Sequence, residues 1–183
     1  MNGRWTIISS LIVAVLALVP RGTYAAPALS LEYAIKATYL YKFAPFVEWP
    51  QSAFETPASQ ISVCIVGNDP VAQALGPTPA DQTVGERPYQ VRRLERVERD
   101  SGCHILYVAA SNAQSASDAM DAVRGTPVLT VTDSARTPAQ GIVSFVVQDN
   151  RVRFDIDDAA AAENGIIISS RLLSLARSVR RRP

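Results

Sequence analysis

Three short blocks of this chain are almost uniformly apolar, and they set its predicted architecture. The blocks are ISVCIVG at residues 61–67, CHILYVA at 103–109 and PVLTVT at 127–132. Runs of this length, rich in β-branched residues and bounded by turn residues, are typical of strands buried on both faces of a parallel sheet. A fourth segment, Tyr89–Leu94, mixes apolar and charged residues, which predicts an edge or half-exposed strand.

The segments between and after these blocks complete the predicted fold. Residues 142–156 alternate between apolar and polar positions around Asp149-Asn150, which predicts a hairpin. Helical patterns occupy Ser111–Val123 and Ser169–Val179, the second with an apolar face near its centre. Strands separated by helices predict an α/β domain with a mostly parallel sheet, helices on both of its faces and an antiparallel hairpin at one edge.

An aromatic-rich segment near the start, YAIKATYLYKFAPFVEWP at residues 33–50, predicts a helix over residues 30–47 that anchors the core. Pro45 is expected to kink this helix and Trp49-Pro50 to end it. Two apolar rows make up its predicted buried stripe: Leu31, Ile35 and Tyr39, and Leu40, Phe43 and Val47.

Residues 1–25 are typical of a secretory signal peptide, since Arg4 precedes an apolar run at Leu11–Val19 and a small-x-small site at Thr23–Ala25. We therefore expect one secreted domain over residues 26–183; the alternative is an uncleaved N-terminal anchor. Cleavage would remove two arginines and no acid, leaving 16 basic and 17 acidic side chains. A near-neutral surface gives no electrostatic case for a nucleic-acid partner.

Cys64 and Cys103 are 39 residues apart and both lie in predicted buried strands. Adjacent strands are about 4.7–4.9 Å apart, a spacing compatible with disulfide geometry, and secretion favours oxidation. We expect a structural disulfide, which would stabilise the fold by about 3–4 kcal/mol. The alternative is two unpaired buried thiols.

No catalytic group stands out. The single histidine, His104, is next to Cys103, and neighbouring side chains on a strand point to opposite faces, which argues against a Cys–His dyad. The chain has no zinc-type cysteine spacing and no glycine-rich phosphate loop. We therefore expect neither an enzyme nor a bound metal or cofactor.

Asn68, Asp69 and Asp133 follow predicted parallel strands, where open α/β sheets place ligand-binding groups. They are the candidates for a small-ligand site. The plainer interpretation is local: Asn68-Asp69-Pro70 is a turn and helix start, and Asp133-Ser134 is a helix cap.

Two charged runs lie near the end of the chain. The acids Asp155, Asp157 and Asp158 could bind calcium, but helix capping by Asp157 or Asp158 is the plainer account. The last helix is expected to carry the basic residues at its negative end, with an anionic membrane as the alternative contact. These basic residues are Arg177, Arg180, Arg181 and Arg182.

Taken together, five blocks of the chain resemble the YfiR family. They are K-A-x-Y-L-Y-x-F-x-x-F-x-E-W-P at 36–50, VCIVGNDP at 63–70, CHILYV at 103–108, VLTVTD at 128–133 and VRFDIDDAAAAENGIIISSRLLSLA at 152–176. The first and last blocks are specific to the family, whereas the middle ones are common in α/β proteins. The resemblance implies a periplasmic α/β regulator with Cys64 paired to Cys103. It also implies repression of an inner-membrane diguanylate cyclase (YfiN-like), relieved by an OmpA-like outer-membrane lipoprotein (YfiB-like).

The chain departs from the family's best-known member in three places. Thr137–Val152 contains no cysteine, so a second, redox-sensing cysteine pair is absent. Gln140-Gly141 stands where the family often has Gly-Gly, and Asp157-Asp158 where it commonly has Asn-Leu. The last two changes are compatible with the same fold but could alter a binding surface.

Two function hypotheses follow. The first is a periplasmic repressor of cyclic-di-GMP synthesis, with a homodimer as one possible state. The second is a small-ligand sensor or solute-binding domain that serves a histidine kinase or transporter and uses Asn68, Asp69 and Asp133. The candidate partner-binding residues of the first are Tyr33, Tyr41, Phe46, Arg171 and Arg177.

Overall fold

The computed structural model describes residues 31–76, 83–109 and 111–182, so the predicted signal peptide lies outside the described residues. One eight-stranded sheet has the order β10-β8-β7-β6-β5-β2-β4-β3. Its strands are β2 (Ile61–Val66), β3 (Thr83–Val84), β4 (Arg87–Leu94), β5 (Ile105–Val108), β6 (Leu129–Asp133), β7 (Val143–Gln148), β8 (Arg151–Asp157) and β10 (Ser178–Arg180). In a second, two-stranded sheet, β1 (Val47–Glu48) pairs antiparallel with β9 (Ile167–Ile168).

The predicted fold class is confirmed. Strands β4, β2, β5, β6 and β7 pair in parallel, and β7 and β8 form the antiparallel hairpin. Asp149 and Asn150 make its turn with φ values of 50° and 56°, a left-handed conformation that Asn and Asp tolerate well. Beyond the hairpin, β10 adds a parallel strand to the outer side of β8.

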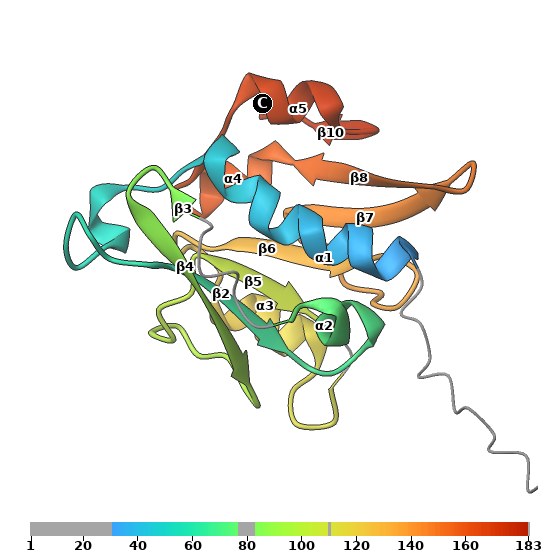
Figure 1. Ribbon diagram of the computed structural model, residues 1–183, viewed down its shortest axis with the longest axis horizontal. Helices are drawn as coiled ribbons and strands as arrows, with labels where there is room; N and C mark the ends of the chain where they lie inside the picture. Colours follow the sequence, from blue (N-terminus) through green and yellow to red (C-terminus); the bar gives the residue numbers. More distant parts are fainter. Residues whose placement is uncertain (1–30, 77–82, 110, 183) are drawn as a thin grey trace, which may run out of the picture.

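Helices cover the sheet unequally. In Figure 1, α1 (Leu31–Phe43) and α2 (Pro70–Ala74) lie in front of the sheet and α3 (Ala116–Ala122) lies behind it. The larger core packs under α1 and α2, and includes side chains of α4 (Asp158–Glu163) and α5 (Ser170–Leu175). The smaller core packs under α3 and is confined to the β2–β5 half of the sheet. The opposite half, on the α3 side, has no described helix over it.

The aromatic segment anchors the larger core, as predicted, through rings of α1 and the hairpin. Phe43 is 5.3 Å from Phe154 and 5.9 Å from Phe145 between ring centroids, and Tyr39 stacks on Phe43. Edge-to-face and stacked pairs of this kind add to the stabilisation that burial provides.

The predicted extent of this helix and its buried stripe are corrected. Helix α1 ends at Phe43, and Ala44–Phe46 forms a 3-10 turn around Pro45, which cannot donate a backbone hydrogen bond. The chain then extends into β1, since its partner β9 satisfies the backbone. The first predicted row is largely outside the core: Leu31 is 76% and Ile35 37% exposed. The buried row consists of Lys36, Ala37, Leu40 and Phe43.

The last predicted helix is also shorter than expected. Helix α5 is capped by Ser169, whose side chain accepts from the Leu172 amide, and ends at Leu175 because Ala176 adopts an extended conformation. Ser178–Arg180 then forms β10 instead of a further helical turn. The closing arginines therefore do not lie at the end of a helix, and the interpretation that they offset its dipole was wrong.

The predicted disulfide joins Cys64 in β2 to Cys103, just before β5, with 5.7 Å between the Cα atoms. Cys64 is fully buried and Cys103 is 7% exposed, both within the smaller core. The bridge thus fastens two neighbouring strands on the side that α3 covers.

Candidate functional site

The carboxyl ends of the parallel strands hold a buried ion pair that the sequence did not reveal. Lys36 of α1 is completely buried, and its Nζ donates to Asp133 Oδ2 and to Glu32 Oε1, each at 2.6 Å. Asp133 is the last residue of β6 and is 1% exposed. An ammonium group can be buried only when it is paired and hydrogen-bonded, so this contact fixes α1 over β6.

Asp69 is engaged in a second buried cluster beside it. Its Oδ1 accepts from the Ala72 amide at 2.7 Å, which confirms the predicted cap of α2. Its Oδ2 accepts from the hydroxyl of Tyr107 at 2.7 Å. Burial, and then the negative charge of Asp69, raise the pKa of Tyr107 well above its usual value, so this hydroxyl stays protonated and donates.

The three predicted ligand-binding residues therefore do not present free groups at one site. Asp133 is not a helix cap: its Oδ1 accepts from the Ala135 amide at 3.2 Å in a turn, and the described chain forms no helix between Asp133 and β7. Asn68 alone is exposed, on the rim of a separate surface hollow of about 700 Å³. The carboxylate oxygens of Asp69 and Asp133 accept hydrogen bonds from within the protein.

His104 makes two hydrogen bonds to the backbone. Its Nδ1 accepts from the Ser62 amide at 3.1 Å, so Nε2 carries the proton and donates to the Ala53 carbonyl at 3.0 Å. Burial lowers the pKa of this imidazole. Because Cys103 is bridged to Cys64, neither side chain is available as a base or nucleophile.

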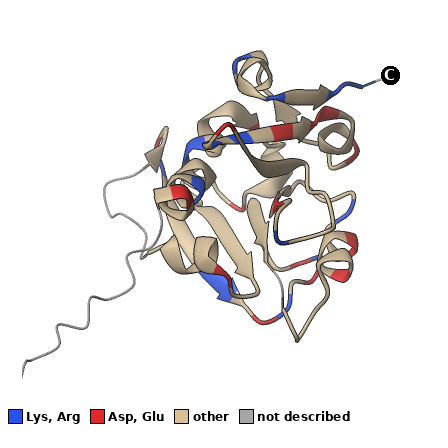
Figure 2. Ribbon diagram, turned by 90° about the vertical axis from the view of Figure 1, so that its right-hand side faces the viewer, with Lys and Arg blue, Asp and Glu red and all other residues tan. Residues whose placement is uncertain are grey.

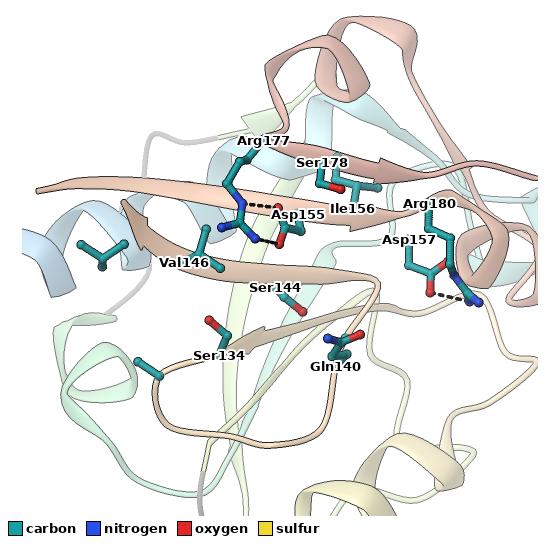
Figure 3. Close-up of a pocket in the computed structure, with 13 residues that line it drawn as sticks. Ser134, Gln140, Ser144, Val146, Asp155, Ile156, Asp157, Arg177, Ser178 and Arg180 are labelled. Carbon is teal, nitrogen blue, oxygen red and sulfur yellow. Dashed lines mark hydrogen bonds and ion pairs between the residues drawn. The ribbon is translucent and has the colours of Figure 1, made fainter. Parts of the chain in front are cut away.

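A polar groove of about 800 Å³ lies on the half of the sheet that α3 leaves uncovered (Figure 3). Side chains on one face of adjacent strands form its floor: Ser144 of β7 is opposite Asp155 of β8, which is opposite Ser178 of β10. Gly141 also lines the groove, and a Cβ atom there would come within 2.8 Å of the Thr130 carbonyl oxygen. Only glycine fits that approach without displacing the backbone.

Acid–base pairs line the outer wall of this groove. Arg177 binds Asp155 through two hydrogen bonds, the one from Nε being 2.8 Å long, and Arg180 contacts Asp157 (Figure 3). Asp157 also caps α4 by accepting from the Ala160 amide at 2.9 Å, as predicted. Among the described residues, no group of three or more His, Cys, Asp or Glu side chains could hold a metal ion.

A family comparison gives this geometry its context. Residues 33–177 match the sequence model of the YfiR/HmsC-like proteins. The chain belongs to the YfiR/HmsC-like family. No curated protein matches the chain.

The YfiR/HmsC-like family is a regulatory and periplasmic family that is not known to be enzymatic, and membership supports a regulatory role in cyclic-di-GMP signalling. No helix among the described residues is long and apolar enough to cross a membrane. The family match ends at Arg177, one residue before β10 begins.

Within this YfiR/HmsC-like domain, the five candidate partner-binding residues do not form one surface. Tyr33 is partly buried beneath the guanidinium group of Arg136, 5.0 Å from its ring centroid. Tyr41 packs edge-to-face on Tyr89, 5.4 Å away between centroids. Arg177 lines the polar groove on the other side of the sheet.

The structure does bring Phe46 close to the start of α5, which carries Arg171. The Phe46 carbonyl accepts from the amide of Ser169, the N-cap of α5, at 2.9 Å. Arg171 and Leu175 are one turn apart and both exposed, Leu175 to 61%. We call Phe46, Ile167, Arg171 and Leu175 the α5 surface. Ile167, which pairs with Glu48, two residues after Phe46, is 50% exposed.

Proposed function

We propose that this protein is a periplasmic repressor that binds the periplasmic domain of an inner-membrane diguanylate cyclase and lowers cyclic-di-GMP synthesis. The observation that carries the proposal is the YfiR/HmsC-like match over residues 33–177, from α1 to the residue before β10. An OmpA-like outer-membrane lipoprotein is the proposed partner that relieves repression. The pattern of side chains agrees with a binding protein, because the buried side chains of Asp69, His104 and Asp133 are engaged in internal contacts.

The proposed mechanism is a shift in a conformational equilibrium. Repression requires the protein to bind the inactive state of the cyclase more tightly than the active state. The extent of inhibition is limited by that difference in affinity; a shift from 1:99 to 99:1 needs a difference of about 10⁴-fold.

We propose the α5 surface as the cyclase-binding surface. It combines exposed apolar side chains, Ile167 and Leu175, with the cation of Arg171, for which the described residues show no ion pair. Arginine is enriched at protein interfaces, and the buried centre of an interface is more apolar than the rest of a protein surface. Tyr33 and Tyr41 are less suited to direct contact because their rings pack against the protein itself.

The test is to express the secreted protein in its host with the candidate cyclase and to measure cellular cyclic-di-GMP and capture of the cyclase from membranes. We expect the wild type to lower cyclic-di-GMP and to retain a cyclase of the diguanylate type. Arg171→Glu should abolish both effects, whereas the matched control Arg124→Glu, another exposed arginine on the opposite side of the sheet, should not. A folded, abundant wild type that neither captures a cyclase nor changes cyclic-di-GMP would refute the function; equal activity of both variants would refute the surface.

A further inference from the structure

The last strand of the sheet is attached in an unusual way. β10 has only three residues and pairs in parallel with β8, Ser178 opposite Asp155 and Arg180 opposite Asp157. It follows α5 after two residues, Ala176 and Arg177. Ser178 and Arg180 are exposed, Val179 is partly buried, and none of the three belongs to either core. Apolar burial therefore contributes little to holding this strand.

Three arginine–aspartate ion pairs, which we call the ladder, connect the end of the chain to the rest of the domain. Arg177 pairs with Asp155, Arg180 with Asp157, and Arg182 with Asp158, the last through two hydrogen bonds of 2.9 and 3.0 Å. Basic and acidic segments accordingly lie side by side next to the C-terminus (Figure 2). The arginine side chains are 40–67% exposed, so salt can screen all three pairs.

The acceptor side of this ladder belongs to the body of the domain. Asp155 and Asp157 are part of β8, whose other edge pairs with β7 along six residues, and Asp158 starts α4. The donor side is Arg177 and the residues after it, of which Arg180 and Arg182 lie beyond the family match. Without β10, the outer edge of β8 would present unpaired backbone groups beside three carboxylates.

We propose that this edge of β8 is a docking site for an arginine-bearing extended segment of a partner protein, and that β10 is its resident, releasable occupant. The recognition has two parts: strand addition supplies backbone hydrogen bonds, and the carboxylates select arginine side chains. Release would also remove Arg177, Ser178 and Arg180 from the wall of the polar groove, so occupancy of the site controls the shape of that face.

Salt-dependent hydrogen exchange on the wild-type protein is the first test. Raising the salt from about 20 mM to 1 M, where the screening length falls to about 3 Å, should speed exchange of the β10 amides about tenfold, the combined effect of three exposed pairs. The control is β9, a strand of two residues for which the described residues show no ion-pair ladder with β1. Unchanged protection of β10, or an equal loss at β9, would overturn the proposal.

A peptide-binding experiment on the full chain tests the acceptor. The triple variant Arg177→Ala, Arg180→Ala, Arg182→Ala removes the donors of the resident strand and leaves the carboxylates in place. A fluorescent peptide Arg-Ser-Val-Arg-Arg-Arg should bind this variant saturably. Binding should be at least about tenfold weaker when Asp155→Asn, Asp157→Asn and Asp158→Asn are added. Asparagine also caps helices, so α4 retains its start in the control.

The outcomes are decisive because hydrogen exchange reports whether β10 has left. If the triple variant keeps β10 protected, the ladder does not hold the strand. If β10 is released but the peptide does not bind, or binds equally without the carboxylates, the edge of β8 is not a docking site. Either result contradicts the proposal.

Discussion

The centre of the sheet and its C-terminal margin place their charged pairs in opposite settings. At the centre, Lys36 and Asp133 are 0% and 1% exposed and pair at 2.6 Å beneath α1. At the margin, the three pairs between β8 and the chain end include arginines that are at least 40% exposed. When one partner of a buried ion pair is removed, the other charge stays buried without water or a partner, which is costly. When one partner of an exposed pair is removed, water solvates the other charge.

The two regions also differ in helix cover and in covalent cross-linking. The centre has helices on both faces and the Cys64–Cys103 bridge between β2 and the start of β5. In the described part of the chain, the core under α3 does not extend to the margin, which ends in a three-residue strand. The difference shows that one domain can combine a rigid frame with an adjustable edge. Mutations in the two regions should therefore differ in how much they lower the free energy of unfolding.

The largest effect is expected at the buried pair. Lys36→Ala should lower the free energy of unfolding by about 3–5 kcal/mol, because Asp133 would remain buried without its close counter-ion, with only Arg136 left at 4.0 Å. Urea denaturation followed by circular dichroism measures this. Lys36→Met combined with Asp133→Leu should recover much of the lost stability. If Lys36→Ala alone costs less than about 1 kcal/mol, the carboxylate of Asp133 is solvated by water in the variant.

The disulfide should rank second. Replacing Cys64 and Cys103 together by alanine should cost about 2–4 kcal/mol, since the unfolded chain regains the freedom of the 39-residue separation. The same denaturation experiment on the oxidised wild type and the double variant gives the difference. An unchanged unfolding midpoint would show that packing under α3 suffices without the bridge.

A pH effect should come from His104, at the centre of the sheet. Burial lowers the pKa of this imidazole in the folded protein, so the unfolded chain binds the proton more readily. The stabilisation from the neutral ring is present above about pH 6.5, the usual histidine pKa, and declines as the pH falls below it. Thermal unfolding between pH 7.5 and 5 should show this decline in the wild type and a weaker one in His104→Gln; identical profiles would assign the decline to other groups.

The smallest effect is expected at the margin. Arg180→Ala should change the free energy of unfolding by no more than about 1 kcal/mol, the ordinary value of an exposed ion pair. Arg124→Ala, which removes the exposed pair with Asp121, is the matched control and should have a similarly small effect. A loss above about 2 kcal/mol at Arg180 would place the final strand within the cooperative unit of the domain.

The sequence predicted the features that local patterns determine. The uniformly apolar runs became β2, β5 and β6 because strands buried on both faces have no polar side. Asp69 before Pro70 predicted the start of α2, and the Asp149-Asn150 turn predicted the hairpin. These signals depend on a few neighbouring residues and not on partners far away in the sequence.

Features that depend on distant partners were missed or wrong. Lys36 is four and seven residues before Leu40 and Phe43, so its place in the apolar row was a readable signal of burial, but its partner Asp133 is 97 residues away. Ser178–Arg180 carries no apolar alternation; it becomes a strand only because β8 offers an edge and carboxylates. The α5 surface likewise depends on β1 pairing with β9.

The disulfide has a further consequence for how the chain responds to proteases. Cys64 and Cys103 enclose β4 and the segments on either side of it, so a cut anywhere between them leaves two polypeptides joined through sulfur. Such a nicked molecule would migrate as one species on a non-reducing gel and separate only after reduction. In an oxidising compartment, a single cleavage in that region would therefore leave the molecule in one covalent piece.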